Sequence, residues 1–298
     1  MMLSVGIVTY ESQPELLDKT VGSLLNAISI AHQAYGLTAR IVFVLNDRKA
    51  HHIQQVEALV AQSKQQAPDY VEIVTLGGHG NIGYGAGQNK GIQCGESDYY
   101  LVLNPDVSFD SNILLKSIRY LESHPGDVMV VPQGYDQAER YAYLSKRAPT
   151  IPVLLARAFS SSWLNRVFRT QVARYTYKDM LPSLEPRSIT LASGCFMFCR
   201  TAALRKVNGF DEGYFLYFED FDLSFRLKRI GNIVELPDIR ICHYGGETAH
   251  RDAWRKFHFL KSAIRFFSRY GWRRPSHQRS AFVAPELSSE ISVLDKTA

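Results

Sequence analysis

Short apolar runs alternate with segments of helical periodicity through the first half of the chain, and this alternation constrains the fold more than any other feature. The apolar runs predict strands at residues 3–10, 40–45, 71–76 and 98–103. This order is typical of βαβ units and of a mostly parallel α/β sheet. Because such sheets bind ligands at the carboxyl ends of their strands, the polar residues that follow each strand are the first candidates for function.

The composition is that of a folded, mildly basic protein. The chain has 298 residues, 46% of them hydrophobic, so it can bury a sizeable core, and its formal net charge of +5 permits an anionic partner. Four cysteines are too few for a disulfide scaffold, and we interpret them as reduced core residues. No apolar run approaches about 18 residues and no basic leader is present, so we expect a cytoplasmic protein that touches a membrane at most from the side.

The helical and strand patterns weaken between residues 134 and 186, after a predicted helix at 113–122 and a predicted strand at 128–132. The weak segment is consistent with a lid or specificity insert and equally with a packing segment that has no clear period. The pattern returns in the apolar run at 189–198, which predicts another strand.

Seven glycines between residues 77 and 91 predict a loop that approaches a ligand closely. Asn81, Gln88 and Asn89 lie among them, which favours a site for phosphate or sugar over an ordinary connection. The dinucleotide fingerprint G-x-G-x-x-G is absent, and the loop follows the third predicted strand, which argues against a Rossmann dehydrogenase. A nucleotidyltransferase would need the loop directly after the first strand.

Asp106 and His243 each follow an apolar run. A carboxylate at a strand end, as in L103-N-P-D106, can hold a hard divalent cation against a diphosphate. Asn-Pro-Asp is also good turn chemistry, so spacing alone leaves turn and site equally open. A lone histidine is more often structural, although at a strand end it can give a neutral nitrogen to the same cation.

Aromatic residues precede three acids in the stretch Y214-F-L-Y-F-E-D-F-D222. Acids at the start of a helix over a core of aromatic rings are one explanation, since carboxylates favour a helix N-terminus. A general base whose pKa is raised toward neutrality by aromatic walls is the other. The residues alone leave both open.

Together these motifs resemble the inverting GT-A glycosyltransferases of sequence family 2, in particular the bacterial rhamnosyltransferases that build O-antigen and related polysaccharides. The resemblance rests in order on V5-G-I-V-T-Y10, G80-N-I-G-Y-G-A-G-Q-N-K-G91, L101-V-L-N-P-D106, S193-G-C-F-M-F-C-R200, N208-G-F-D-E-G-Y-F-L-Y-F-E-D-F-D-L-S-F-R226 and His243. It implies an α/β GT-A fold, with a Rossmann-like, mixed and mostly parallel sheet flanked by helices. The implied catalytic domain spans residues 1–250, with a variable insert at 134–186 as the expected acceptor region. A helical extension at 251–275 and a flexible tail at 276–298 follow.

The resemblance also implies a metal-dependent reaction that inverts the anomeric carbon of a nucleoside diphosphate sugar. The expected donor is dTDP-L-rhamnose, and the expected acceptor is a saccharide linked to polyprenyl diphosphate at the cytoplasmic face of a membrane. Another donor, such as a UDP-hexose, UDP-GlcNAc or UDP-galactofuranose, stays open, as does an inactive scaffold that binds carbohydrate or membrane. No nucleic acid partner is expected.

By this resemblance Asp220 is the general base, with Glu219 beside it, and Asp106 and His243 bind Mg²⁺ or Mn²⁺. Asn104 stands where the metal motif of the family has an acid, so we expect weaker metal binding than in an Asp-x-Asp relative. Asp47 stands one place later than the acid of many relatives. The expected donor-binding residues are Thr9, Tyr10, Glu11, Asn46, Asp47, Asn81, Gly83, Tyr84, Gly85, Asn89 and Asn104. The expected phosphate or acceptor region comprises Tyr217, Asp222 and Arg226.

The segment from Arg251 to Pro275 is basic and predicts an amphipathic helix. At helical spacing one side carries basic residues, namely Arg251, Arg255, Lys261, Arg265 and Arg269. The other side is mainly apolar, with Phe259, Leu260, Ala263, Phe266, Phe267 and Tyr270. Either the helix packs on the core and leaves a solvated basic face, or it lies on an anionic lipid surface.

Overall fold

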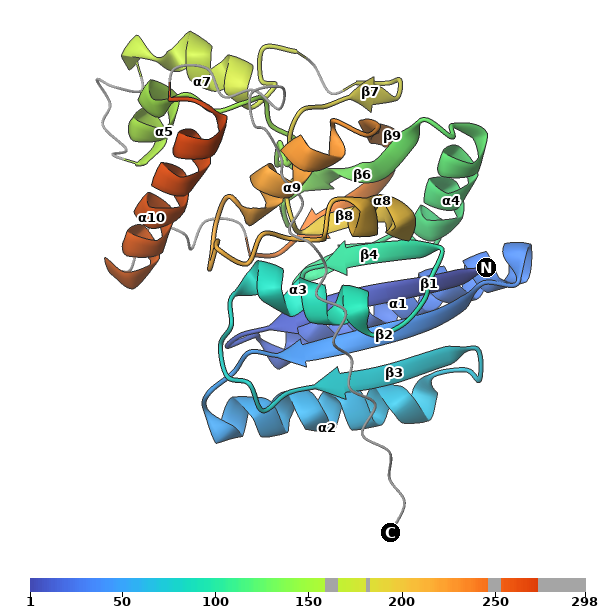
Figure 1. Ribbon diagram of the computed structural model, residues 1–298. Helices are drawn as coiled ribbons and strands as arrows, with labels where there is room; N and C mark the ends of the chain where they lie inside the picture. The colour runs from blue at the N-terminus through green and yellow to red at the C-terminus, as the bar shows by residue number, and fades with distance from the viewer. Residues whose placement is uncertain (159–165, 181–182, 246–252, 273–298) are drawn as a thin grey trace.

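The computed structural model describes residues 1–158, 166–180, 183–245 and 253–272. Within these ranges the centre of the protein is a nine-stranded mixed sheet of order β3-β2-β1-β4-β8-β6-β9-β5, with β7 paired to β9 (Figure 1). The strands are β1 (Met2–Thr9), β2 (Thr38–Leu45), β3 (Val71–Leu76), β4 (Tyr99–Leu103), β5 (Val107–Phe109), β6 (Asp127–Tyr135), β7 (Arg187–Ser188), β8 (Phe196–Arg200) and β9 (Asn232–His243). The longer ladders are parallel, which confirms the predicted α/β sheet.

Helices cover both faces of this sheet (Figure 1). They are α1 (Pro14–Tyr35), α2 (Ala50–Gln66), α3 (Tyr84–Gln93), α4 (Ile113–Ser123), α5 (Ile151–Ala158), α7 (Arg169–Tyr175), α8 (Thr201–Lys206), α9 (Glu219–Leu227) and α10 (Ala253–Tyr270). One apolar core lies between the sheet and α1, α2 and α4, and a second lies between the sheet and α3, α8 and α9. The central strands read as continuous apolar runs because both of their faces are buried.

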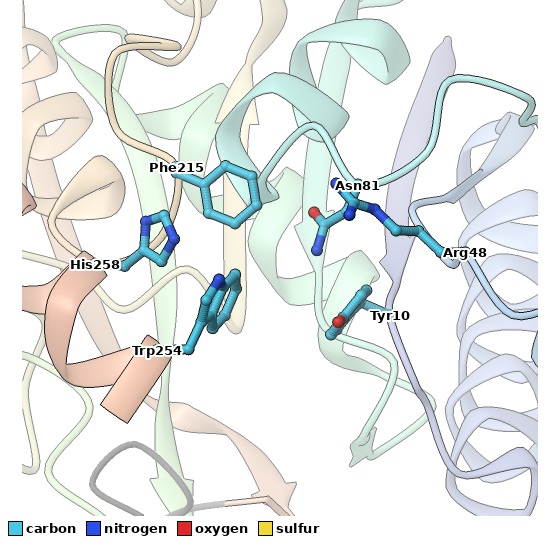
Figure 2. A pocket seen from close by; sticks show the side chains of 6 residues that line it. All are labelled: Tyr10, Arg48, Asn81, Phe215, Trp254 and His258. Atoms are coloured by element: carbon cyan, nitrogen blue, oxygen red, sulfur yellow. The ribbon is translucent and has the colours of Figure 1, made fainter. Parts of the chain in front are cut away.

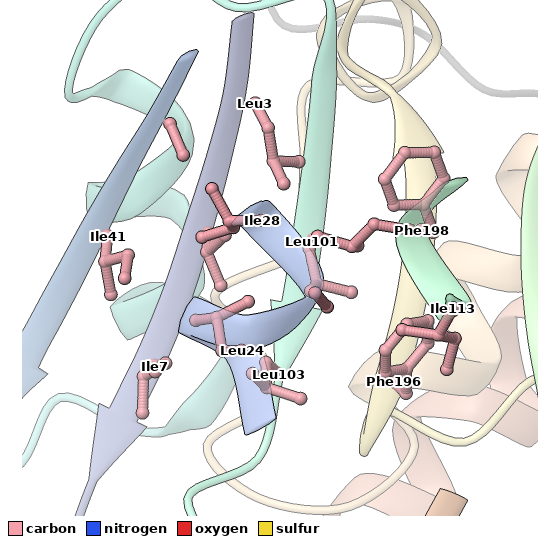
Figure 3. Packing of buried hydrophobic residues seen from close by; sticks show 14 of the residues in the cluster. Leu3, Ile7, Leu24, Ile28, Ile41, Leu101, Leu103, Ile113, Phe196 and Phe198 are labelled. Atoms are coloured by element: carbon pink, nitrogen blue, oxygen red, sulfur yellow. The ribbon is translucent and has the colours of Figure 1, made fainter. Parts of the chain in front are cut away.

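The first core shows why the strand and helix patterns of the sequence were informative. In Figure 3, Leu24 and Ile28 of α1 pack against Ile7 of β1 and Leu101 of β4. Pro14 begins this helix, and Gly36 ends it in the left-handed conformation with φ 62°.

The predicted glycine loop at 77–91 is shorter than expected, because α3 begins at Tyr84. Gly85, Gly87 and Gly91 therefore lie in a helix. A Cβ on Gly91 would come within 2.2 Å of the Tyr100 hydroxyl, so glycine is required there for close packing of α3 on the sheet, not for a ligand.

The last described helix, α10, packs on α9 through a cluster of buried aromatic residues that includes Phe225, Phe266 and Tyr270. The packing alternative for this segment is thus confirmed for its inner side. Two expectations for its outer sides are wrong. Leu260 is exposed and not part of the packed side, and Arg269 is only partly exposed and donates to Asp222 at 3.0 Å. Both differences arise because α10 turns its aromatic rings toward the core, which places Leu260 toward solvent and Arg269 toward Asp222.

The segment at 134–186 contains α5 and α7, which lie beside α10 in Figure 1. Within the described ranges no helix is long and apolar enough to cross a membrane. Residues 251–252 and everything after 272, including the tail predicted at 276–298, lie outside the described part of the chain.

Candidate active site

The carboxyl ends of β1 and β2 are tied together by Asp47. Its carboxylate accepts hydrogen bonds from the Glu11 backbone N–H at 2.6 Å and from the Thr9 hydroxyl at 3.3 Å. Asp47 and Thr9 are both buried, so they shape the loop that follows β1. This arrangement leaves Tyr10 exposed at the strand end, and Glu11 pairs with Lys49 at 2.8 Å.

The start of α3 is fixed against β2 and against the segment that precedes α9. The Asn46 amide donates to the Gly83 carbonyl at 2.9 Å, and the Gly83 N–H donates to Asn81 Oδ1 at 3.0 Å. Gly83 has φ 91°, and a Cβ there would lie 2.5 Å from the Phe215 carbonyl oxygen, so only glycine fits. The Tyr84 N–H donates to the same Phe215 carbonyl. Asn46, Asn81 and Gly83 therefore fix the start of α3 beside the strand ends, where the sugar donor is expected to bind.

Asn89 forms its hydrogen bonds inside the protein and not at the strand ends of the candidate site. Its side chain is buried, accepts from the Phe210 N–H at 2.8 Å and donates to the Phe210 carbonyl and to Glu212, each at 2.9 Å. Its amide is thus used within the protein to hold the turn before α9 against α3. The expected donor contact of Asn89 is corrected to this structural role. Gly85 has a packing role too, because a Cβ there would lie 3.0 Å from the Cβ of Phe210.

Asp106 and His243 are neighbours across the sheet. The antiparallel pairing of β5 with β9 aligns Val107 with His243, and the imidazole Nε2 lies 3.4 Å from Asp106 Oδ1. The Tyr244 N–H donates to the Asp106 carbonyl at 3.0 Å. A Cβ on Gly245 would lie 2.1 Å from Asp106 Oδ2, so the backbone at Gly245 passes directly over the carboxylate.

These residues fit a divalent cation. Asp106 Oδ1 is buried and has no hydrogen-bond partner among the described residues, although it lies beside an imidazole nitrogen. No cluster of three or more His, Cys, Asp or Glu side chains occurs in the described ranges, so the described residues alone do not form a full metal cage there. Two protein ligands suit an ion such as Mg²⁺, which keeps waters and binds substrate phosphates.

Glu219 and Asp220 begin α9 after two residues with positive φ, Tyr217 at 66° and Phe218 at 65°. Asp220 stays partly exposed, and its carboxylate accepts from the Gly194 N–H at 3.1 Å and from the Phe221 N–H at 2.9 Å. Glu219 is buried, and its Oε2 has no hydrogen-bond partner among the described residues. Left-handed backbone at non-glycine residues is strained, and such strain concentrates at functional sites.

Burial shifts the pKa of both acids. Burial raises the pKa of Asp220 to about 6. Burial also raises the pKa of Glu219 well above its ordinary value, and the charge of Asp220 raises it further. At neutral pH Asp220 is therefore mostly ionised, while the surroundings of Glu219 favour its protonated form. A partly exposed carboxylate that titrates near neutrality suits a general base.

The segment Gly194–Cys195 connects the cation residues with the acid pair. The Gly194 N–H donates to Asp220 at 3.1 Å, and the next residue, Cys195, binds the segment that leads to Asp106. The Cys195 carbonyl accepts from the Asn104 N–H at 2.9 Å. Tyr84 donates its hydroxyl to the adjacent Gly194 carbonyl at 2.7 Å. The fold thus brings the predicted metal ligands and the predicted base to one place.

Asp222 and Arg226 are not available to a phosphate or an acceptor. Arg226 donates to Asp222 at 2.6 Å and to the Val207 and Gly209 carbonyls, and both side chains are buried. The second oxygen of Asp222 accepts from Arg269 and from the Tyr270 hydroxyl of α10. The expected binding roles of Asp222 and Arg226 are corrected to the anchoring of α10. Tyr217 is half-buried and packs edge-on against Phe259 of α10.

A cavity of about 270 Å³ opens between the strand ends and α10 (Figure 2). It is lined by Tyr10, Arg48, Asn81, Phe215, Trp254 and His258. The sequence analysis singled out Tyr10 and Asn81 and missed the other four. A signal was present for Trp254 and His258, because residues four apart share one face of a helix. Arg48 and Phe215 carry no such signal, since only the fold brings their segments together.

A mixed sheet of this order, with acids and a histidine at its strand ends, is the architecture of a GT-A glycosyltransferase. Residues 4–207, more than half of the chain, match the model of glycosyl transferase family 2, and the chain belongs to this family. It is a glycosyltransferase.

Two curated relatives have related names. Rhamnosyltransferase WbbL of Escherichia coli is 30% identical over 198 residues, which are 62% of this chain and 71% of that protein. An N-acetylglucosaminyl-diphospho-decaprenol L-rhamnosyltransferase of Mycobacterium tuberculosis is 27% identical over 191 residues, which are 58% of this chain and 59% of that protein. The match therefore spans less than two thirds of the mycobacterial relative.

Solved structures share the fold. GalNAc-T7 with UDP, GalNAc and Mn²⁺ superposes with a TM-score of 0.62 at 13% identity, over 91% of this chain and 48% of that one. Staphylococcus aureus TarS in complex with UDP-GlcNAc superposes with a TM-score of 0.54 at 16% identity, over 90% of this chain and 67% of that one. At these identities the likeness establishes the fold alone.

Proposed function

We propose that this glycosyltransferase moves L-rhamnose from dTDP-L-rhamnose to a saccharide acceptor, with inversion at the anomeric carbon and with Asp220 as general base. The observation that carries the proposal is that one short segment links the three groups: the Gly194 N–H binds Asp220, and the Cys195 carbonyl binds Asn104, two residues before the Asp106 carboxylate that lies beside His243. The choice of rhamnose is supported by the names of the two curated relatives.

In the proposed reaction Asp220 accepts the proton of the acceptor hydroxyl while that oxygen attacks the anomeric carbon. The new glycosidic bond forms on one face as the bond to the diphosphate breaks on the other, and the nucleoside diphosphate leaves with the bonding electron pair. The Gly194 and Phe221 N–H groups hold the Asp220 carboxylate in place. Because its pKa is near 6, this carboxylate is ionised at neutral pH and still basic enough to take a proton.

Asp106 and His243, with the amide of Asn104 nearby, would hold Mg²⁺ or Mn²⁺ on the donor diphosphate. A bound divalent cation neutralises the charge that develops on the leaving diphosphate. Asp106 contributes the only negative charge of this ligand set, so the cation is expected to bind well only together with the diphosphate.

We further propose that the acceptor is linked to polyprenyl diphosphate and that the protein works on the cytoplasmic face of a membrane. The outer side of α10 supports this, because Phe257, Leu260 and Ile264 are exposed at helical spacing, next to exposed Lys256 and Lys261. The two segments at 151–180 and 253–270 carry ten Lys or Arg and one Asp or Glu. Such a basic and apolar surface suits anionic lipid.

A donor panel tests the proposed function. The purified protein is incubated with dTDP-L-rhamnose, UDP-glucose, UDP-GlcNAc or UDP-galactofuranose and a polyprenyl diphosphate-linked acceptor, with and without Mn²⁺, and nucleoside diphosphate release is measured. We expect acceptor-dependent release from dTDP-L-rhamnose that a chelator abolishes. Preferential release from a UDP-sugar would overturn the rhamnose assignment, and full activity in chelator would overturn the role of the cation.

A further inference from the structure

The cavity beside the reaction centre has two walls of different chemistry. Figure 2 shows Tyr10, Arg48 and Asn81 on one side, from the segments that follow β1, β2 and β3. Phe215, Trp254 and His258 face them from the other side. The first wall belongs to the sheet edge and the second is contributed largely by α10. A ligand at the ends of β1 and β2 would therefore contact both.

The α10 wall consists of three aromatic rings in mutual contact. The ring centroids of Phe215 and Trp254 are 5.6 Å apart, those of Phe215 and His258 are 4.6 Å apart, and those of Trp254 and His258 are 4.4 Å apart. Even so, 44% of the Trp254 surface stays exposed. A large aromatic ring that lines a cavity and is only half covered offers its face for stacking.

This wall is held in a fixed position. Arg269 and Tyr270, at the far end of α10, bind the buried carboxylate of Asp222, and the Ser262 hydroxyl donates to the Leu216 carbonyl at 2.8 Å. The Phe215 carbonyl accepts from the Tyr84 N–H, which joins the wall to the start of α3. The two walls are thus preorganised, and a ligand between them need not order the helix on binding.

The position of the cavity indicates which part of a donor would fill it. None of Asp106, His243 and Asp220 lines it, so the cavity lies beside the reacting bond and not at it. The nucleoside is the part of a nucleoside diphosphate sugar that extends away from the diphosphate. It also contains a planar base, which stacks well on aromatic side chains.

Accordingly, we propose that the N-terminal turn of α10 forms one wall of the nucleoside pocket, and that the base lies between Tyr10 on the sheet side and Trp254 with Phe215 on the helix side. Arg48 and Asn81 supply hydrogen-bond donors for the polar edge of the nucleoside. His258 supports the two rings from behind. This inference rests on the proposed function only in that the donor carries a nucleoside diphosphate, whichever sugar is attached.

Two features of α10 agree with this placement. Burial and the nearby charge of Lys261 lower the pKa of His258, so its ring is neutral at neutral pH and does not place a charge against the base. The hydrogen bond from Lys49 is the main reason that the pKa of Glu11 is lowered, and the charge of Arg255 lowers it slightly further. Arg255, the residue after Trp254, thus lies close enough to the loop after β1 to act on it electrostatically.

Titration of the full chain with dTDP tests the proposal, with intrinsic tryptophan fluorescence and calorimetry as readouts. We expect Trp254→Ala to weaken dTDP binding about tenfold, and Trp254→Phe to keep the affinity within about twofold while losing the fluorescence change. Trp272→Phe is the matched control, because Trp272 is also half-exposed but lies at the other end of α10. This variant should keep both the dTDP affinity and the fluorescence change. Affinity for inorganic pyrophosphate should be the same in all four proteins.

Two outcomes would overturn the proposal. Unchanged dTDP affinity in Trp254→Ala would show that the Trp254 ring does not contact the nucleoside. A rise in KM for the acceptor alone would show that this wall binds the acceptor and not the nucleoside. A failure of the proposed function looks different. If dTDP binding depends on Trp254 but no rhamnose is transferred, the pocket stands and the rhamnosyl assignment falls.

Discussion

The imidazole Nε2 of His243 lies 3.4 Å from Oδ1 of Asp106, because β5 and β9 pair in antiparallel register and bring two distant segments together. If this pair holds the cation, Asp106→Ala should weaken Mn²⁺ binding in the presence of dTDP more than His243→Ala does, since Asp106 is the charged member of the pair. Each loss should be roughly tenfold or more. Asp110→Asn, an exposed acid just past β5, is the matched control. Equal affinities in Asp106→Ala and in the control would contradict the metal site.

Asp220→Asn should lower kcat by about 10² to 10⁴, because it removes the proton acceptor while it keeps the shape of the side chain and one of its two N–H contacts. Steady-state kinetics and dTDP binding measured on the same preparation separate chemistry from binding. The donor affinity should stay within a few fold. Glu219→Gln is the comparison, since burial favours the protonated form of Glu219 and an amide resembles that form. A Glu219 variant as inactive as Asp220→Asn would show that we have assigned the base to the wrong acid.

The pH profile should follow Asp220. Burial raises the pKa of Asp220 to about 6, and the base must be ionised to act, so kcat/KM should fall as the pH drops through about 6. The apparent value belongs to the coupled pair with Glu219. We expect the acidic limb to stay near pH 6 in Glu219→Gln. A profile flat from pH 5 to pH 8 would contradict this account.

Glu219 should also make stability depend on pH. Burial, together with the charge of Asp220, raises the pKa of Glu219, so the folded state favours its protonated form. Its contribution to stability is present below its unfolded pKa and is lost as the pH rises through the raised folded pKa. Urea unfolding should therefore show Glu219→Gln gaining stability relative to the wild type as the pH is increased. The opposite trend would mean that the carboxylate has an unseen cationic partner.

Asp222 should matter for stability and, through α10, for donor binding. Asp222→Ala leaves the buried guanidinium of Arg226 without its counter-charge, which costs about 3–5 kcal/mol of unfolding free energy. Glu72→Ala, which breaks the exposed pair with Arg40, should cost about 1 kcal/mol or less. Because Asp222 also binds Arg269 and Tyr270, the same substitution should weaken dTDP binding. Wild-type dTDP affinity in a folded Asp222→Ala protein would argue that α10 does not need this anchor.

Lipid binding should depend on the outer side of α10. Replacement of Phe257, Leu260 and Ile264 by serine should release the protein from vesicles of phosphatidylglycerol with phosphatidylcholine in a flotation assay, since it removes three side chains that can enter the interface. Tyr35→Ser, an exposed aromatic residue at the end of α1, is the control. Point variants are preferable to deletion of residues 251–298, because deletion would also remove Phe266 and Phe267 from the core. Undiminished flotation of the triple variant would show that this side of α10 does not bind lipid.

Much of the sheet could be predicted because β1, β2 and β4 are buried on both faces and read as unbroken apolar runs. The glycines of α3 could not be interpreted correctly from composition. A glycine in a loop and a glycine that lets a helix approach a strand look the same in a sequence, and only the contact of Gly91 with Tyr100 separates them.

The candidate site was predictable where one residue follows one strand, as for Asp106. It was not predictable where partners come from distant segments. Asp222 and Arg226 stand four apart on one helix, a spacing that favours an ion pair and that the sequence interpretation passed over. The contact of Trp254 with Phe215 depends on how α10 packs on the rest of the protein. The segment at 134–186 lies beside α10, and its weak sequence pattern did not reveal this packing.

The most direct test of the central claim is an NMR measurement of the product formed from dTDP-L-rhamnose and a polyprenyl diphosphate-linked saccharide in the presence of Mn²⁺. We expect one new rhamnosyl linkage with the anomeric configuration opposite to that of the donor, formed by the wild type and not by Asp220→Asn. A product with retained configuration, or equal product from Asp220→Asn, would contradict it.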